Sequence, residues 1–287
     1  MNIPNGKDLK GANFEGANFH KVNFQDVDLY GANLINVNLE EGNLKGANLK
    51  KAGLLGANLK KADLRNTNCE GAYFIQTHLE EANLEGANLK LADLREAKLD
   101  RAELRGANLE RADLRKANLE GANFREANLQ EANLLEVNLE GANLEGANLK
   151  KAGLLAANLK VTDLRKASFE DAFLIGANLE KANLEGANFE GACLIQAHLN
   201  GAELRGVNLQ AANLGGANIE DADFQEANLK GASFKEASLA RTDLTRAKNL
   251  SLNQLSKAKT LYEAKLDEKI LITLKKKYPA LFEEPKR

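Results

Sequence analysis

The chain has 287 residues with 39 basic and 41 acidic side chains, so its formal net charge is −2 at neutral pH. A charge so near zero gives no strong long-range attraction to nucleic acid or to an anionic membrane, and we expect neither as a direct partner. No run approaches the ~18 apolar residues of a membrane span, and no secretory signal is visible. With only two cysteines, Cys69 and Cys193, the sequence predicts a cytoplasmic protein with reduced thiols.

The dominant pattern is a period of five residues that runs from Leu9 to Leu244. Every fifth residue over this span is Leu, Phe, Ile or Cys, and we call it position i. Position i−2 is nearly always Ala, whereas positions i−1, i+1 and i+2 are mostly polar or Gly. A period of five matches neither an α-helix nor the alternation of an ordinary strand. It predicts a coil that turns a corner every five residues, with positions i and i−2 inside.

Glycine marks the predicted corners, because 19 of the 23 glycines fall at position i+2. A type II turn that begins at position i requires a positive φ at its third residue, position i+2, and Gly adopts this φ without steric cost.

Longer repeats give the length of a coil. Residues 49–59 recur at 149–159 and residues 102–109 recur at 202–209, whereas residues 75–79 recur at 195–199. All three offsets are multiples of 20, which favours four-sided coils of 20 residues. About twelve such coils, stacked at the ~4.8 Å spacing of strands, would make a rod roughly 55–60 Å long.

The repeating unit, as in Ala12-Asn13-Phe14-Glu15-Gly16 and Ala62-Asp63-Leu64-Arg65-Asn66, resembles the pentapeptide repeat proteins from Leu9 to about Ala247. The resemblance implies an all-β fold, a right-handed quadrilateral parallel β-helix, and the handedness comes from the resemblance alone. We expect a lead-in over residues 1–8, the β-helix over 9–247 and a short α-helical cap over 248–287.

The two ends of the chain differ. Phe14, Phe19 and Phe24 occupy three early positions i, and the short lead-in leaves open whether that edge is thinly covered or pairs with another chain. At the other end, Ser251 to Gln254 reads as a capping box that opens a short helix. A second amphipathic helix is expected from Asp267 to the residue before Pro279. We interpret this tail as a cap, with a basic docking helix as the alternative.

Sequence motifs for catalysis are absent. The chain has no Gly-rich phosphate loop, no nucleophile elbow and no zinc-type Cys or His pair. Its three histidines are His20, His78 and His198. Cys69 falls at an interior position, whereas Cys193 falls at an outward one and would be a reachable thiol. We therefore expect no catalytic residue, no metal, no cofactor and no enzymatic activity.

Position i+1 carries the most informative surface pattern. Large apolar residues at this position fall almost entirely on one of the four predicted faces, in two ladders across residues 33–76 and 133–196 that Arg95 and Arg115 separate. Exposed apolar patches of a few hundred Å² usually mark interaction sites. Two alternatives stay open: the second ladder copies the first by duplication, or the tail covers part of the face. The candidate partner-binding residues are Ile35, Leu55, Tyr73, Ile75, Leu135, Leu155, Phe173, Ile175 and Ile195.

The leading hypothesis is a non-enzymatic protein-interaction or regulatory scaffold that uses the outer faces of a rigid β-helix. The resemblance supports it, since cyanobacterial members of the family include a regulator that acts through protein contacts, and the tail around Leu261 and Phe282 is similar to theirs. One alternative is a DNA mimic that modulates DNA gyrase, although Lys and Arg nearly cancel the acidic residues here. A structural homo-oligomer is the other. The partner's identity stays open.

Overall fold

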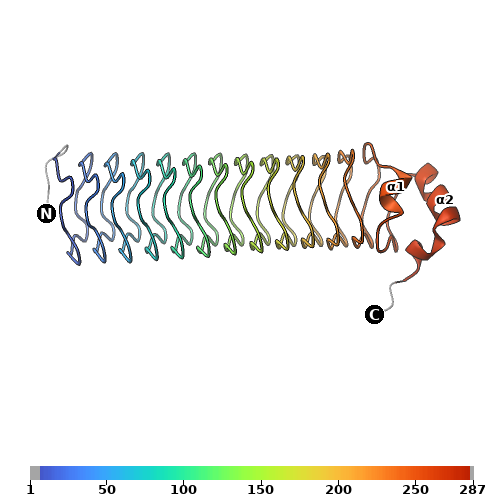
Figure 1. The fold of residues 1–287 in the computed structure, drawn as a ribbon, viewed down its shortest axis with the longest axis horizontal. Helices are drawn as coiled ribbons and strands as arrows, with labels where there is room; N and C mark the ends of the chain where they lie inside the picture. Colours follow the sequence, from blue (N-terminus) through green and yellow to red (C-terminus); the bar gives the residue numbers. More distant parts are fainter. Residues whose placement is uncertain (1–6, 285–287) are drawn as a thin grey trace. The chain divides into compact units, whose positions relative to one another are not determined.

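The computed structural model describes residues 7–284, and the chain divides into two compact units, Met1–Asn148 and Leu149–Arg287. In each unit the chain winds into coils that lie one beside the next (Figure 1). Residues 1–6, which form most of the predicted lead-in, lie outside the described residues.

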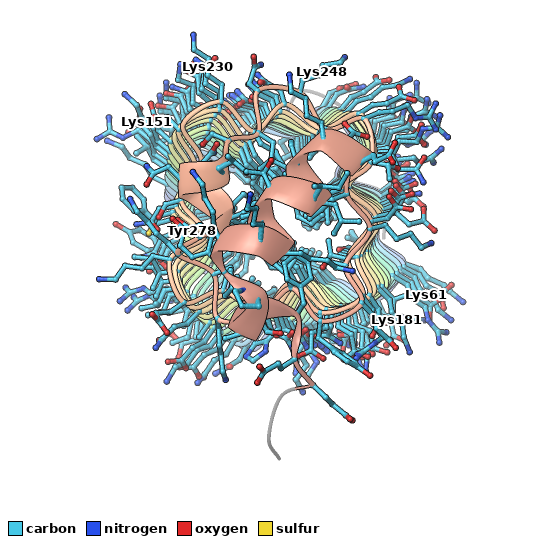
Figure 2. The ribbon with its side chains drawn as sticks, turned by 90° about the vertical axis from the view of Figure 1, so that its right-hand side faces the viewer. Lys61, Lys151, Lys181, Lys230, Lys248 and Tyr278 are labelled. Atoms are coloured by element: carbon cyan, nitrogen blue, oxygen red, sulfur yellow. The ribbon has the colours of Figure 1, made fainter. Side chains whose placement is uncertain are left out.

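Single parallel bridges between residues 20 positions apart hold neighbouring coils together. In the first unit Asn13 is bridged to Asn33, and in the second Gly153 is bridged to Phe173. Bridged residues recur every five positions along the chain, so each coil has four sides. Each side contributes one bridge residue between two corners, which is too short for an extended strand. The side chains of the second unit, such as Lys151 and Lys181, point outward from these sides (Figure 2).

The main-chain hydrogen bonds repeat from coil to coil. The amide at position i donates to the next coil, as from Leu34 to the Gly53 carbonyl at 2.7 Å. The amide at position i−1 donates to the preceding coil, as from Asn33 to the Ala12 carbonyl at 2.9 Å. This pattern fixes which side chains point inward, because positions i and i−2 lie on the inner side of the same backbone.

The corners have positive φ at position i+2, as the glycine pattern predicts. Gly106 has a φ of +63°, but Lys51 and Val161 have φ values of +59° and +57° at equivalent corners. Glycine is therefore preferred at this position without being required. The left-handed conformation costs a residue with a Cβ roughly 1–2 kcal/mol, and the hydrogen bonds on both sides of the corner offset that cost.

Asparagine at position i−1 has a structural role that the sequence pattern did not reveal. The Asn13 side-chain oxygen accepts a hydrogen bond from the Glu15 amide at 3.2 Å, which closes a local turn. The Asn33 side-chain nitrogen donates to that same oxygen at 3.0 Å, so the carboxamides also form a ladder between coils. Asn188 and Asn208 form the equivalent bond in the second unit at 2.9 Å.

The interior is a continuous apolar column within each unit. The side chains at position i and the alanines at i−2 are almost completely buried from Val22 onward. Phe14 and Phe19 pack edge to face with ring centroids 5.2 Å apart, whereas Phe169 and Phe189 stack at 4.5 Å. Each fully buried Leu or Phe contributes roughly 1.5–3 kcal/mol, so the repeated core stabilises every coil.

The tail of the second unit forms three short helices: α1 (Leu252–Leu255), α2 (Glu268–Lys277) and the 3₁₀-helix η1 (Pro279–Phe282) (Figure 1). A capping box formed by Ser251 and Gln254 opens α1. The Gln254 side-chain nitrogen also donates to the Leu229 and Ala232 carbonyls at 2.7 and 2.9 Å. Neither α-helix in the described part of the chain is long and apolar enough to cross a membrane. The limits 9–247 and 248–287 stay predictions.

Gly106→Val tests the cost of a corner. A Cβ at Gly106 meets no atom within 4 Å, so only the positive φ opposes the change. We expect Gly106→Val to lower the free energy of unfolding by about 1–2 kcal/mol. Gly106→Asn, which tolerates this conformation better, should cost clearly less. Chemical denaturation measures both, and equal losses would contradict the backbone explanation.

Gln254→Leu tests how the tail ends the stack of coils. The substitution keeps the size of the side chain but leaves two carbonyls without their donor, so we expect a loss of about 1–3 kcal/mol. Hydrogen exchange should show faster opening of the coil that contains Leu229. Asn253→Leu, at an exposed neighbouring position, is the matched control. Similar exchange in both variants would show that Gln254 does not hold this coil.

Candidate interaction surface

In the first unit the candidate residues lie on one face of successive coils. Ile35, Leu55 and Ile75 occupy position i+1, the first turn residue of the corner that ends this side, and their side chains lie outside the core. Tyr73 occupies position i−1 on the same face and is bridged to Gly53 of the preceding coil. Tyr73 is 53% exposed and Leu55 is 39% exposed, while the two isoleucines are half-buried. The structure therefore brings these four apolar side chains together at the surface.

The second unit repeats this arrangement. Leu155, Ile175 and Ile195 follow one another at position i+1, and Phe173 lies beside them, bridged to Gly153 on one side and to Cys193 on the other. Phe173 is 55% exposed and Leu155 is 45% exposed. The described part of the tail forms hydrogen bonds to the coils only from Ala227 onward and leaves Phe173 exposed.

Glycine opens the surface beside the aromatic ring of Tyr73. A Cβ added at Gly53 would contact only the Cγ1 atom of Ile35, at 4.0 Å. Because Gly53 has no carboxamide, the Leu55 amide lacks the acceptor that Asn33 provides for the Ile35 amide at 3.2 Å. The Ile75 amide also lacks a protein acceptor within residues 7–284, since Tyr73 replaces the usual Asn. Two outward main-chain donors therefore lie among the apolar side chains.

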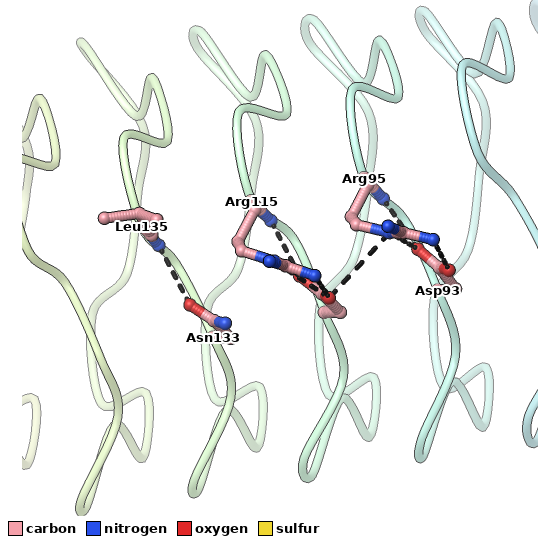
Figure 3. Close-up of polar contacts among 6 residues, drawn as sticks. Asp93, Arg95, Arg115, Asn133 and Leu135 are labelled. Atoms are coloured by element: carbon pink, nitrogen blue, oxygen red, sulfur yellow. Dashed lines mark hydrogen bonds and ion pairs between the residues drawn. The ribbon is translucent and has the colours of Figure 1, made fainter.

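The i+1 residues Ile35, Leu55 and Ile75 form the apolar row of the first unit. Two ion pairs lie between this row and Leu135. Arg95 binds Asp93 through two nitrogens, at 2.8 and 2.7 Å, and Arg115 binds Asp113 in the same way (Figure 3). The Arg95 Nε atom also lies 3.9 Å from Asp113, which links the two pairs. Such bidentate contacts fix the orientation of both guanidinium groups.

Leu135 lies past these pairs, half-buried on the same face, where the Asn133 side-chain oxygen accepts from its amide at 3.3 Å (Figure 3). A shallow hollow of about 310 Å³ extends here. It is lined by Arg95, Glu96, Arg115, Lys116, Leu135 and Glu136. Within the first unit Leu135 is thus separated from the group that contains Ile75.

Opposing influences set the pKa of Asp113. Burial by itself would raise the pKa, but hydrogen bonds from Arg115, together with the charges of Arg115 and Arg95, hold it below the ordinary value of 3.8. The carboxylate is therefore ionised at neutral pH and the pair stays intact.

The charged faces consist largely of pairs between coils. Lys50 lies 2.9 Å from Glu70, and the same 20-residue spacing joins Lys60 to Glu80 at 3.3 Å. In the second unit Arg241 contacts Asp221 at 2.7 Å. Exposed pairs of this kind contribute less than about 1 kcal/mol each. Their main consequence is that basic groups interrupt the acidic surface.

The groups with possible chemistry are scattered. Cys69 is fully buried, and burial raises the pKa of its thiol to about 12, so the thiol stays protonated at neutral pH. Cys193 is half-buried. The His78 Nδ1 atom lies 3.2 Å from Glu80. Within residues 7–284 no group of three or more His, Cys, Asp or Glu side chains is arranged to hold a metal ion.

Comparison with known proteins places the repeat in a family. The profile described as Pentapeptide repeats matches overlapping segments that together run from residue 5 to residue 259. No curated protein matches the chain.

Comparison with solved structures finds several similar chains. HetL, a pentapeptide repeat protein involved in heterocyst differentiation regulation in Nostoc sp. strain PCC 7120, is 36% identical over 72% of this chain and 89% of its own, with a TM-score of 0.44. A pentapeptide repeat protein from the Arabidopsis thaliana thylakoid lumen is 35% identical over 34% of this chain and 68% of its own, with a TM-score of 0.33. The fluoroquinolone resistance protein QnrB1 is 16% identical over 79% of this chain and 96% of its own, with a TM-score of 0.39.

Arg115→Leu tests the interruption of the apolar row. It leaves Asp113 without its main partner, so the pKa of Asp113 should rise. In the wild type, the lowered pKa of Asp113 adds stability that is present above about pH 4 and is lost as the pH falls through that lowered pKa. We therefore expect a lower melting temperature than the wild type at pH 7 and a smaller difference below about pH 4, in thermal melts across this range.

Asp113→Asn/Arg115→Leu is the matched control, because it recreates the arrangement of Asn133 and Leu135. We expect its stability at pH 7 to stay within about 0.5 kcal/mol of the wild type. A single variant that is as stable as the double variant at neutral pH would show that the ion pair does not stabilise this turn.

Proposed function

Because the chain belongs to the pentapeptide repeat family, we propose that it is a non-enzymatic interaction protein whose outward apolar rows bind a protein partner. Ile35, Leu55 and Ile75 form one row together with Tyr73, and the second unit carries a similar row. This proposal includes a regulatory role and a cytoplasmic location.

The observation that carries the proposal is the exposure of aromatic and aliphatic side chains at positions that elsewhere hold Asn and charged residues. Tyr73 and Phe173 replace Asn at position i−1 and are more than half exposed. Exposing a large apolar side chain gives no stability to the fold, and aromatic residues are enriched at the centres of protein interfaces. Each β-helical unit would present its row without rearranging, which reduces the entropic cost of binding.

HetL, by its name, takes part in regulating differentiation, and that role is a property of HetL. We propose a regulatory role of the same general kind here, with a partner that the apolar rows recognise. The DNA-mimic alternative gains no support from the described surface, because Lys60 and Arg241 pair with acidic residues along the acidic face. Self-association through the same rows would give a concentration-dependent mass in light scattering.

Affinity capture from the native lysate tests the proposal. We expect the wild type to retain a protein that Tyr73→Glu/Phe173→Glu loses, because a carboxylate in each apolar row must be desolvated on binding. The backbone accepts glutamate at this position, since Glu103 and Glu203 already occupy it. Quantitative mass spectrometry should show at least a tenfold loss of that protein.

Val161→Glu is the control, because Val161 is 51% exposed and lies at a corner that does not border the side holding Phe173. Its captured proteins should match those of the wild type. Equal losses in both variants, or none in either, would reject the apolar rows as the binding surface.

A further inference from the structure

We infer that the chain carries two equivalent binding sites, one in each unit, and that each takes an amphipathic α-helix with acidic residues along the edge of its apolar stripe. The first site is formed by Leu55, Tyr73 and Ile75 with Lys51, and the second by their counterparts 100 residues later. This inference rests on the proposed function and specifies the chemistry and the number of partner segments.

The two sites are related by an internal repeat that has changed unevenly. Between residues 33–76 and 133–176, seven of the nine residues at position i+1 are identical, whereas only two of the nine at position i+2 are identical. Both positions face solvent, so packing against the core does not account for the difference. Part of the agreement lies in charged pairs between coils, but Leu55 and Ile75 are retained without any such pairing. Leu55 and Ile75 have thus been kept in both copies, whereas most residues at position i+2 have changed.

One of the two i+2 residues that are identical in both copies is a lysine, which gives each site a positive charge. Lys51 and Lys151 flank the apolar row in the two copies and are both exposed. Neither forms an ion pair with another described residue, whereas the adjacent Lys50 is paired with Glu70. An unpaired cation at the same edge of both sites is complementary to a carboxylate on the partner.

Main-chain donors point to the same partner chemistry. The amides of Leu55 and Ile75 lack a protein acceptor in the described chain, and so do those of Leu155 and Ile175. At ordinary coils a side-chain oxygen at position i−1 accepts this hydrogen bond, as at Asn33 and Ile35. A carboxylate or amide oxygen of a bound segment would satisfy these donors among the apolar contacts.

The spacing of the rows favours a helix over a strand. Three successive coils place their i+1 side chains over about 9.6 Å, at ~4.8 Å per coil. A helix lying along the coil axis presents residues separated by seven positions over about 10.5 Å. Alternate residues of a strand would need roughly 13–14 Å for three contacts. The helix therefore stays in register with Ile35, Leu55 and Ile75, and with the row that contains Ile175.

A designed peptide tests the inference without knowledge of the natural partner. The probe is an 18-residue fluorescent helix of Leu, Ala and Glu, with leucines three or four positions apart and glutamates along one edge of that stripe. Isothermal titration of the full chain should give two sites per molecule. Tyr73→Glu and Phe173→Glu should each leave one site, and the double variant none. One site or none in the wild type would overturn the inference.

Charge variants separate the acidic edge from the apolar contact. Lys51→Glu/Lys151→Glu should keep two sites but weaken binding about two- to fivefold at low salt, the value expected for exposed ion pairs. A probe with Gln in place of Glu should not distinguish this variant from the wild type. Val161→Glu should retain two sites of unchanged affinity. If the probe does not bind while lysate capture still depends on Tyr73 and Phe173, the inference is wrong and the proposed function stands.

Discussion

Main-chain pairing between residues 20 positions apart is the constraint on which the rest of the structure depends. Each coil offers its amides and carbonyls to its neighbours at the same four sides, as between Asn13 and Asn33. A chain held in this way cannot insert or remove a residue without moving all later side chains to the wrong position. The strict five-residue period from Leu9 to Leu244 follows from this requirement, because one slip would place polar side chains in the core.

The same constraint leaves the outward positions free to vary, and the chain uses them in three ways. Asparagine at i−1 closes the local turn and bonds to the next carboxamide, as in Asn33. Lysine and glutamate 20 residues apart form pairs such as Lys50 and Glu70, which add little stability individually. The third use is the apolar row, where Tyr73 cannot form the turn-closing bond and the Ile75 amide has no acceptor among residues 7–284.

The inward and outward positions, the coil of 20 residues and the positive φ at i+2 follow from the sequence because they depend on a repeated local rule. Three features were not predictable in the same way. Lys51 and Val161 adopt the left-handed corner without glycine, since inter-coil bonds outweigh a local preference. The role of Gln254 depends on contacts with Leu229, 25 residues earlier. The ion pair between Asp113 and Arg115 depends on side-chain geometry, although the sequence shows that the two residues are two positions apart.

The exposed side chains of the apolar rows do not stabilise the local structure, and this is the strongest reason to assign them a function. Replacing Asn by Tyr73 or Phe173 removes a turn-closing acceptor and exposes an aromatic ring without adding a core contact. A sequence that satisfies its repeat rule nearly everywhere else is expected to break it where function requires. Retention of Leu55 and Ile75 in two copies, next to corners that have changed, is consistent with a surface selected for what binds it. The charged faces give no comparable reason to propose a binding function, because ion pairs between neighbouring coils already account for their residues.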